Sequence, residues 1–143
     1  MFAKEAKILI VDDMTSIRDL VRVSLNKLGY ENITEAQDGM QALEMIKSQK
    51  KLGRQYDLVL CDWNMPRMMG IDLLKTVRRD PEWEFLPFIL VTTESEKINI
   101  LEAIASGVSD YIVKPFSVTV LQNKMASVHK RLIETLKKGR PVS

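Results

Sequence analysis

The sequence predicts an α/β protein with one parallel five-stranded sheet and helices on both of its faces. Short apolar runs alternate with amphipathic segments along the chain, which gives a (βα)5 pattern. The runs lack polar alternation, as expected of strands buried on both sides in a parallel sheet. Because parallel strands are joined by right-handed crossovers, the helices should divide between the two faces of a doubly wound sheet.

Length, composition and charge are those of an ordinary globular protein. Of the 143 residues, 45% are hydrophobic and 28% charged, and the formal net charge of +2 is too small to indicate nucleic-acid binding. One cysteine cannot form an internal disulfide, and no apolar run is long enough to span a membrane. Since the N-terminus is too polar for a signal sequence, we expect a cytoplasmic protein. We expect one domain over residues 1–143, with its core from about residue 6 to about residue 138 and no output domain.

The first half of the chain contains three predicted strands and two predicted helices. The strands are expected at Lys7–Val11, Asn32–Ala36 and Leu58–Cys61. Helical spacing of apolar residues predicts one helix that ends at Gly29 and a second from about residue 40 to 48. Their expected inward residues are Ile17, Leu20, Val21, Leu25, Leu28, Leu43 and Ile46. The polar stretch 49–56 is expected to be a solvated connection.

The second half alternates in the same way. A helix is expected at Ile71–Arg79, a strand at Phe85–Val91 and a helix from about residue 95 to 106. The last strand is expected at Asp110–Val113 and the last helix from about residue 118 to 137. The expected inward residues of these helices are Ile71, Leu74, Val77, Ile98, Leu101, Ala105, Val118, Leu121, Met125, Val128, Leu132 and Leu136.

Four of the five predicted strands end in polar residues. These are Asp12 and Asp13 after the first strand, Asp62 after the third, Thr92 after the fourth and Lys114 after the fifth. The carboxyl ends of parallel strands lie along one edge of a sheet, where α/β proteins bind ligands. Each residue also has a simpler explanation, as an acidic turn, a helix cap or a surface lysine. Together the four strand ends favour a shared site.

The residue types at this edge suit phosphoryl transfer. Carboxylates from Asp12, Asp13 and Asp62 are suitable ligands for Mg2+, which would relieve the repulsion among them. A carboxylate can attack phosphorus to give an acyl phosphate, and Asp62 is the candidate because it ends a central buried strand. Lys114 and the Thr92 hydroxyl can then bind the phosphoryl oxygens.

The sequence resembles the response-regulator receiver family of two-component signalling, and within it the chemotaxis members. The resemblance covers nearly the whole chain. It rests on four stretches in order and at similar separations: Ile-Leu-Ile-Val-Asp-Asp, Asp-Trp-Asn-Met-Pro, Thr-Thr-Glu and Asp-Tyr-Ile-Val-Lys-Pro-Phe. It implies a flavodoxin-like sheet with strand order 2-1-3-4-5, an expectation that comes from the family alone.

The resemblance also implies a phosphoacceptor and a metal site. Asp62 would be the phosphorylated residue. Asp13 and Asp62 would hold Mg2+ together with the Asn64 backbone carbonyl, and Asp12 would contribute through water.

The same resemblance implies a switch. Lys114 would contact the phosphoryl group, and the peptide bond after it would be cis. Thr92 would rotate toward the phosphoryl group, and Tyr111 would turn inward when Thr92 moves. Asn64 and Glu94 would flank the water that hydrolyses the acyl phosphate. We therefore expect a switch protein with fast self-dephosphorylation and no other enzymatic activity.

Two features depart from the family pattern. Met69 stands where the family commonly has an aspartate before Gly70, so a carboxylate that could cap the next helix is missing. The stretch 49–56 is several residues longer than in short chemotaxis members. Neither feature changes a residue of the expected site.

The expected output surface lies on the fourth predicted helix. Ile100 and Ile104 should lie beside its core stripe, near Tyr111, with Lys97 and Lys124 at the rim. An apolar patch with a basic rim suits an acidic amphipathic peptide. Chemotaxis members of the family bind the flagellar motor switch through their fourth helix, fifth strand and fifth helix. The alternative is that the two isoleucines are scattered surface residues or a dimer contact.

We expect a monomer whose partners are a histidine kinase, a protein target and a phosphatase, without nucleic acid or membrane. A phosphorelay carrier or phosphate sink would have the same pocket. A Mg2+-dependent phosphatase of the aspartyl-phosphate type would need a second aspartate where Asn64 stands. A flavin-binding module would need a Gly/Ser/Thr-rich loop in place of Asp12 and Asp13.

Overall fold

The apolar runs and amphipathic segments of the sequence form five strands and five α-helices in the described part of the chain. The computed structural model describes residues 1–93 and 97–139, and the side chains of residues 97, 98 and 139 lie outside that description. The elements are β1 (Ile8–Val11), α1 (Thr15–Lys27), β2 (Ile33–Ala36), α2 (Gly39–Lys51), β3 (Leu58–Asp62), α3 (Gly70–Arg79), the 3-10 helix η1 (Pro81–Trp83), β4 (Phe88–Thr92), α4 (Lys97–Ala105), β5 (Asp110–Val113) and α5 (Val118–Gly139).

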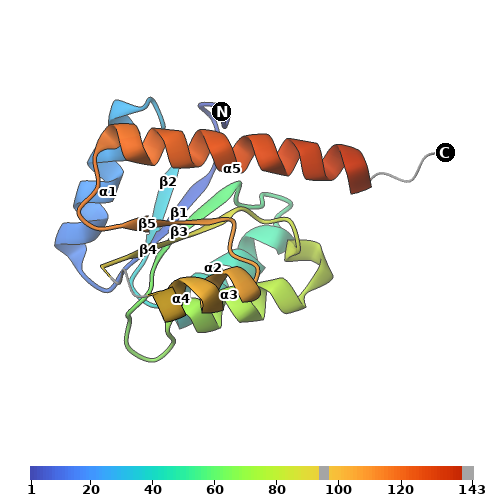
Figure 1. Ribbon diagram of the computed structural model, residues 1–143, viewed down its shortest axis with the longest axis horizontal. Helices are drawn as coiled ribbons and strands as arrows, with labels where there is room; N and C mark the ends of the chain where they lie inside the picture. Colours follow the sequence, from blue (N-terminus) through green and yellow to red (C-terminus); the bar gives the residue numbers. More distant parts are fainter. Residues whose placement is uncertain (94–96, 140–143) are drawn as a thin grey trace.

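All five strands are parallel, and they pair in the order β2-β1-β3-β4-β5. The predicted α/β class and the strand order implied by the resemblance are therefore confirmed. Figure 1 shows α1 and α5 on one side of the sheet and α2, α3 and α4 on the other. Successive strand residues point to opposite faces. Thus Leu9 and Val11 join the core beneath α2, α3 and α4, whereas Ile8 and Ile10 join the core beneath α1 and α5.

Most of the inward positions predicted for the helices are buried. They are Val21, Leu25, Leu43, Ile46, Ile71, Leu74, Val77, Leu121, Met125 and Val128. The prediction was wrong at Leu20, Leu101 and Leu136, which are 63%, 58% and 39% exposed. It was also wrong at Ala105, which is exposed. The helix α4 is rotated so that Ala103, which is 1% exposed, faces the core in place of Leu101 and Ala105.

Two predicted boundaries are corrected by the structure. The helix α2 continues to Lys51, so the first residues of the predicted connection 49–56 are helical. A basic last turn suits the negative end of the helix dipole. The strand β4 begins at Phe88 and not at Phe85, which is 45% exposed. Pro87 directly precedes β4, because a residue without an N–H cannot donate within the sheet.

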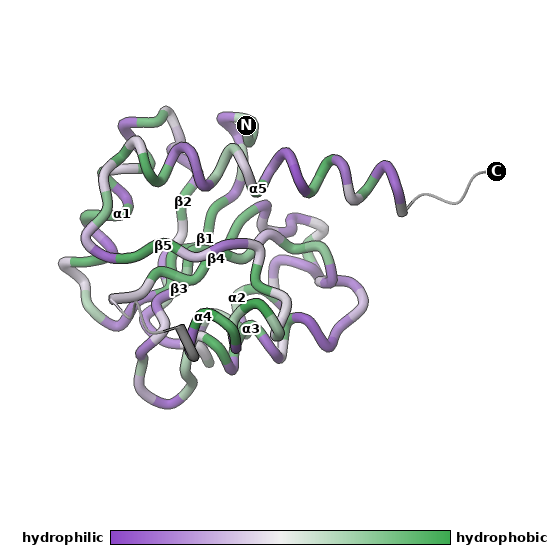
Figure 2. Tube along the Cα trace, in the orientation of Figure 1, coloured by the Kyte–Doolittle hydropathy of each residue, from purple (hydrophilic) through white to green (hydrophobic). Residues whose placement is uncertain are grey.

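The two ends of the described chain differ in how they pack. Phe2 is 6% exposed, and its carbonyl accepts a 2.7 Å hydrogen bond from the Tyr30 hydroxyl. At the other end α5 projects beyond the sheet, and its last turns alternate between hydrophilic and hydrophobic residues (Figures 1 and 2). Among the described residues, no helix is both long and apolar enough to cross a membrane.

Candidate functional site

The polar ends of β1 and β3 meet at one edge of the sheet. Asp12 and Asp13 directly follow β1, and Asp62 is the last residue of β3. One carboxylate oxygen from each of the three lies within 4.8 Å of the others. Asp12 is 3% exposed, whereas Asp13 is open to solvent. The acidic cluster is therefore accessible from one side and buried on the other.

Lys114 bridges two members of the acidic cluster. Its Nζ lies 3.1 Å from Asp12 Oδ2 and 3.1 Å from Asp62 Oδ1. Its backbone N–H donates to the Thr92 carbonyl at 2.7 Å, which ties the end of β5 to the end of β4. The bond between Lys114 and Pro115 is cis, as the resemblance implied.

The charges in this cluster do not balance. Among the described side chains, three carboxylates share the single ammonium of Lys114, so acidic groups outnumber the cations that pair with them. Burial, together with repulsion from Asp12, raises the pKa of Asp62 in spite of Lys114. Burial alone would lower the pKa of Lys114, but attraction to Asp62 and Asp12 outweighs it and raises that pKa. The site therefore favours an additional cation.

The donor set fits a hard divalent cation. Ligand oxygens of six-coordinate Mg2+ lie about 2.1 Å from the ion and so about 3–4 Å from one another. The spread of the three carboxylate oxygens, up to 4.8 Å, is close to that range. Asp12, Asp13 and Asp62 are the residues that could hold the ion, and the Asn64 carbonyl lies in the loop that follows β3.

Neighbouring groups fix Asp12. Its Oδ1 accepts from the Met14 backbone N–H at 2.9 Å, and its carbonyl accepts from Arg18 Nη1 at 2.6 Å. Arg18 also donates through Nε to Glu35 on β2 at 3.0 Å. Arg18 was not among the predicted site residues. The available signal was an arginine next to Ile17 on the inward side of the first helix.

The remaining predicted pocket residues belong to the same sheet edge. Thr92 ends β4, is 3% exposed and lies beside Val113 in the neighbouring strand, one residue before Lys114. Asn64 is exposed, two residues beyond Asp62. Glu94 lies outside the described residues.

The loop between β3 and α3 is held at two points. Gly70 donates its N–H to the Trp63 carbonyl at 2.9 Å, and a Cβ on Gly70 would lie 2.1 Å from the Asp62 carbonyl oxygen. Farther along, Arg67 Nη2 lies 2.6 Å from Asp38 Oδ2. Arg67 and Asp38 were not predicted as site residues, because nothing in the sequence pairs a β2–α2 turn with this loop. The helix α3 begins without a side-chain cap, in keeping with the missing family aspartate.

The predicted output residues lie on α4, β5 and α5. Ile104 is 59% exposed, while Ile100 and Tyr111 are half-buried. Lys124 Nζ lies 4.9 Å from the centre of the Tyr111 ring and 3.0 Å from Asp110 Oδ1. The side chain of Lys97 lies outside the described residues. Leu101 adds an exposed apolar side chain that was predicted to be buried, and we call Ile100, Leu101, Ile104, Tyr111 and Lys124 the α4–β5–α5 surface.

An apolar groove of about 370 Å3 opens beside Lys114. Its apolar walls come from α1 and from the segment after β5. The lining residues are Ile17, Leu20, Val21, Ser24, Thr93, Lys114, Pro115 and Phe116. Leu20 is exposed because it forms part of this groove instead of the core.

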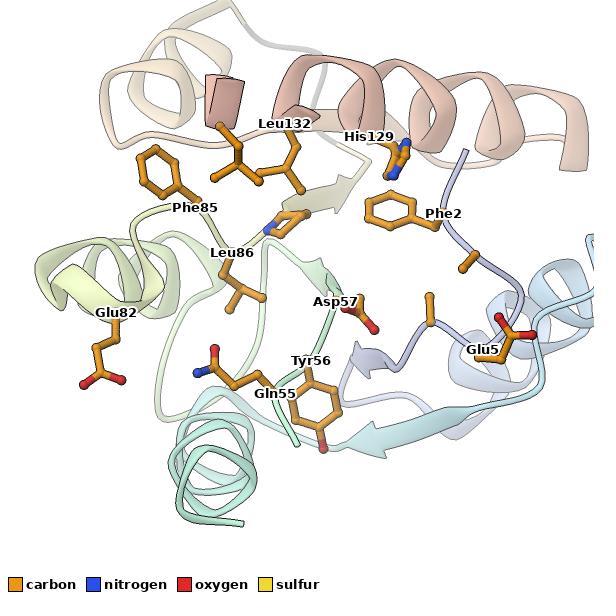
Figure 3. A pocket seen from close by; sticks show the side chains of 14 residues that line it. Phe2, Glu5, Gln55, Tyr56, Asp57, Glu82, Phe85, Leu86, His129 and Leu132 are labelled. Carbon is orange, nitrogen blue, oxygen red and sulfur yellow. The ribbon is translucent and has the colours of Figure 1, made fainter. Parts of the chain in front are cut away.

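A larger hollow of about 490 Å3 lies where the strands begin, at the other end of the sheet. Figure 3 shows Phe2 and His129 side by side beneath α5, with Tyr56 and Glu82 on other walls. The His129 and Phe2 ring centres are 4.9 Å apart. None of the acidic cluster residues lines this hollow, so it is separate from the candidate site.

Comparisons with known proteins identify relatives over most of the chain. A family model described as the response regulator receiver domain matches residues 8–126. The chemotaxis protein CheY-3 of Vibrio cholerae is 45% identical over 129 residues, which cover 90% of this chain and 95% of that protein. The chemotaxis protein CheY of Pseudomonas aeruginosa is 43% identical over 126 residues, which cover 88% of this chain and 98% of that protein.

Solved structures with the same fold include two receiver proteins. Chemotaxis protein CheY4 of Vibrio cholerae matches with a TM-score of 0.76 and 37% identity, covering 87% of this chain and 98% of that chain. The receiver domain of the Francisella response regulator 1452 matches with a TM-score of 0.76 and 31% identity, covering 89% of this chain and 98% of that chain.

Proposed function

The chain belongs to the response regulator receiver family, with relatives in chemotaxis signalling, and from this premise we propose that Asp62 is its phosphoacceptor. The supporting observation is that Asp62 lies 3.1 Å from the Lys114 ammonium and shares a cluster with two further carboxylates. A CheY-like receiver domain is a phosphoacceptor switch, so the pocket has a defined task. In our proposal the donor is the phosphohistidine of a histidine kinase.

The proposed reaction is an in-line displacement at phosphorus. An oxygen of the Asp62 carboxylate bonds to phosphorus, and the bond from phosphorus to the imidazole nitrogen of the donor breaks. The imidazole leaves with the electron pair of that bond, and the product is an acyl phosphate. Lys114 is within 3.1 Å of Asp62 and can neutralise charge on the transferred oxygens.

We propose Mg2+ as the cofactor, held by Asp12, Asp13, Asp62 and the Asn64 backbone carbonyl. When bound, it neutralises negative charge on the phosphoryl oxygens and on the carboxylates. The raised pKa of Asp62, caused by burial and by repulsion from Asp12, supports the need for such a cation. A bound cation would favour the ionised form of Asp62, and the ionised carboxylate is a better nucleophile than the protonated one.

The proposed switch runs from Thr92 to Tyr111. The Thr92 hydroxyl would rotate to donate to the phosphoryl group on Asp62, which leaves room for the Tyr111 ring to turn inward. Tyr111 lies on β5, the strand that pairs with β4, and it is half-buried with Lys124 over its ring. Self-dephosphorylation would use water held near Asn64 and Glu94.

The apolar groove beside Lys114 supports a protein as the phosphodonor. Leu20, 63% exposed, and Phe116 lie in its wall, and Lys114 at its end reaches the acceptor. Exposed apolar surface next to a reactive carboxylate suits a helix that carries the donor histidine. A small-molecule donor would not need this groove.

The α4–β5–α5 surface is the proposed output site. It would bind an acidic amphipathic peptide of a target such as the flagellar motor switch, and a phosphatase would share the pocket side of the molecule. The exposed Leu101 and Ile104 of α4 support this choice because they offer apolar contact, and Lys124 of α5, next to Asp110 and Tyr111, adds a basic group to the same surface. We propose that the protein acts in this way as a cytoplasmic monomer, without binding nucleic acid or membrane.

Intact mass spectrometry with acetyl phosphate tests the acceptor. The wild type should gain one phosphoryl group only when Mg2+ is present, and Asp62→Asn should gain none. Asp57→Asn is the matched control, because Asp57 directly precedes the same strand at its opposite end. An adduct that survives Asp62→Asn would contradict the assignment.

Binding of a fluorescent peptide from a flagellar motor switch protein tests the output. Phosphodonor should strengthen binding to the wild type, and Ile104→Asp should weaken it at least about tenfold, as for a central interface residue. Ile133→Asp, at an exposed position near the end of α5, is the control. Phosphorylation without any gain in binding would favour the alternative of a phosphorelay carrier or phosphate sink.

A further inference from the structure

The loop that follows the acceptor contains the one non-glycine residue with a positive φ among the described residues. Arg67 has φ 66°. A left-handed conformation is unfavourable for an L-residue with a Cβ, so surrounding contacts must hold it. Arg67 is mostly exposed, with 64% of its side chain accessible. Burial therefore does not explain the conformation, and a specific contact is needed.

That contact is an ion pair with Asp38. Arg67 Nη2 lies 2.6 Å from Asp38 Oδ2, and the Asp38 side chain is only 7% exposed. The other oxygen, Oδ1, accepts a 2.8 Å hydrogen bond from the Gln41 backbone N–H and caps α2. The hydrogen bond from Gln41, and after it the interaction with Arg67, lower the pKa of Asp38. Asp38 is thus ionised at neutral pH and joins the start of α2 to the loop after β3.

A second contact presses the loop against the same turn. A Cβ on Gly39 would lie 2.8 Å from Met68 Cβ, so glycine is required for the close approach. The close approach of Gly70 to Asp62 thus joins the two ends of the loop. Its middle is held where Arg67 and Met68 contact Asp38 and Gly39 at the start of α2. Asn64 lies between these anchors.

We propose that the Arg67–Asp38 ion pair positions the Asn64 carbonyl for Mg2+ and so sets the affinity of the acidic cluster for the ion. Neither Arg67 nor Asp38 is among the candidate ligands, so both are positioning residues. The inference rests on the proposed Mg2+ site and adds a determinant of its strength. Groups that orient metal ligands typically change metal affinity about 10- to 100-fold when they are removed.

Magnesium titration followed by Trp63 fluorescence tests the proposal, because Trp63 is buried directly after Asp62. Arg67→Ala and Asp38→Asn should each weaken Mg2+ binding about tenfold. Asparagine is also a good N-cap, so Asp38→Asn removes the charge and keeps the cap of α2. The double variant should bind Mg2+ about as weakly as either single variant, since both remove one interaction. Arg67→Lys, which keeps a positive charge, should recover part of the affinity.

Arg54→Ala is the matched control, because Arg54 is an exposed arginine in the α2–β3 connection, away from the acidic cluster. Amide hydrogen exchange without metal gives an independent measure. The amides of residues 64, 65 and 67–69 should exchange faster in Arg67→Ala than in the wild type. If the wild type binds Mg2+ and both variants bind it with unchanged affinity, the proposed function stands and this inference is wrong. If the wild type binds no Mg2+, both are wrong.

Discussion

Lys114 illustrates how one side chain can neutralise the carboxylates of a site and also compete with the cation that binds there. Its ammonium contacts Asp12 and Asp62 at equal distances of 3.1 Å, inside a cluster that retains excess negative charge. The same position that would stabilise a phosphoryl group stabilises the carboxylates before phosphorylation. Removal of Lys114 should therefore have opposite effects on folding and on Mg2+ binding.

We predict that Lys114→Met lowers the free energy of unfolding by about 2 kcal/mol without metal, because two largely buried carboxylates lose their common partner. The same variant should bind Mg2+ several-fold more tightly, since a competing positive charge is gone. Urea unfolding and a Mg2+ titration measure the two effects. Lys75→Met is the control, because its pair with Glu102 is 39% and 43% exposed and should contribute less than about 1 kcal/mol. Loss of Mg2+ binding in Lys114→Met would contradict the prediction.

At the scale of elements, α1 is held against the sheet by ion pairs as well as by its buried apolar side chains. Glu35 on β2 accepts from Arg18 Nε at 3.0 Å and lies 2.7 Å from Arg22 Nη2. Arg18 also donates to the carbonyl of Asp12, so this cluster supports the strand end that carries the acidic residues. Burial alone would raise the pKa of Glu35, but its hydrogen bonds to Arg22 and Arg18 outweigh burial and lower it.

This pKa shift gives a pH dependence with a definite sign. Because the folded protein binds the Glu35 proton more weakly than the unfolded chain does, the ion pairs stabilise the fold fully above the ordinary carboxyl pKa of 4.5. The stabilisation is lost as the pH falls through the lower pKa of the folded state. Glu35→Gln should lower the free energy of unfolding by about 1 kcal/mol at pH 7 and progressively less toward acid pH. Denaturant unfolding across pH measures this, with the exposed Glu44→Gln as control; a difference that persists at acid pH would exclude the ion-pair explanation.

The start of α1 offers a gain in stability. Its N-cap residue, Met14, is 54% exposed and makes no side-chain capping hydrogen bond. Met14→Ser should raise the free energy of unfolding by about 0.5–1 kcal/mol, since a hydroxyl at this position can accept from a free N–H of the first turn. Thermal unfolding measures the change. Met40→Ser, at another exposed methionine that follows the already capped start of α2, should give no gain.

At the scale of the whole molecule, periodicity predicted the alternation of elements and the convergence of Asp12, Asp62 and Lys114. Buried strands have a strong signal, because residues that cover both faces must all be apolar. No comparable pattern in the sequence indicated how α4 is rotated about its axis. Its apolar residues surround most of the helix, so Leu101 and Ala103 were equally plausible inward residues, and only packing against the sheet selects the smaller one.

Long-range polar contacts were equally absent from the sequence pattern. The pairing of Arg67 with Asp38 depends on how two loops approach each other after the sheet has formed. Periodicity describes one element at a time and carries no information on such an approach. The packing of Phe2 against His129 of α5 is of the same kind, since it joins opposite ends of the chain.

The two termini should therefore contribute very differently to stability. Phe2 is 6% exposed and packs on His129, so Phe2→Ala should lower the free energy of unfolding by about 3 kcal/mol.

The described side chains from Ile133 to Lys138 are all exposed, and the last fully buried residue of α5 is Val128. A chain that ends after Leu132 should lose less than about 1 kcal/mol, because frayed helix ends form few packing contacts. Denaturant unfolding of both variants measures the contrast, and phosphorylation by acetyl phosphate should persist in the shortened chain because the acidic cluster lies at the other end of the sheet. A large loss of stability on truncation would mean that the last turns of α5 are part of the folded core.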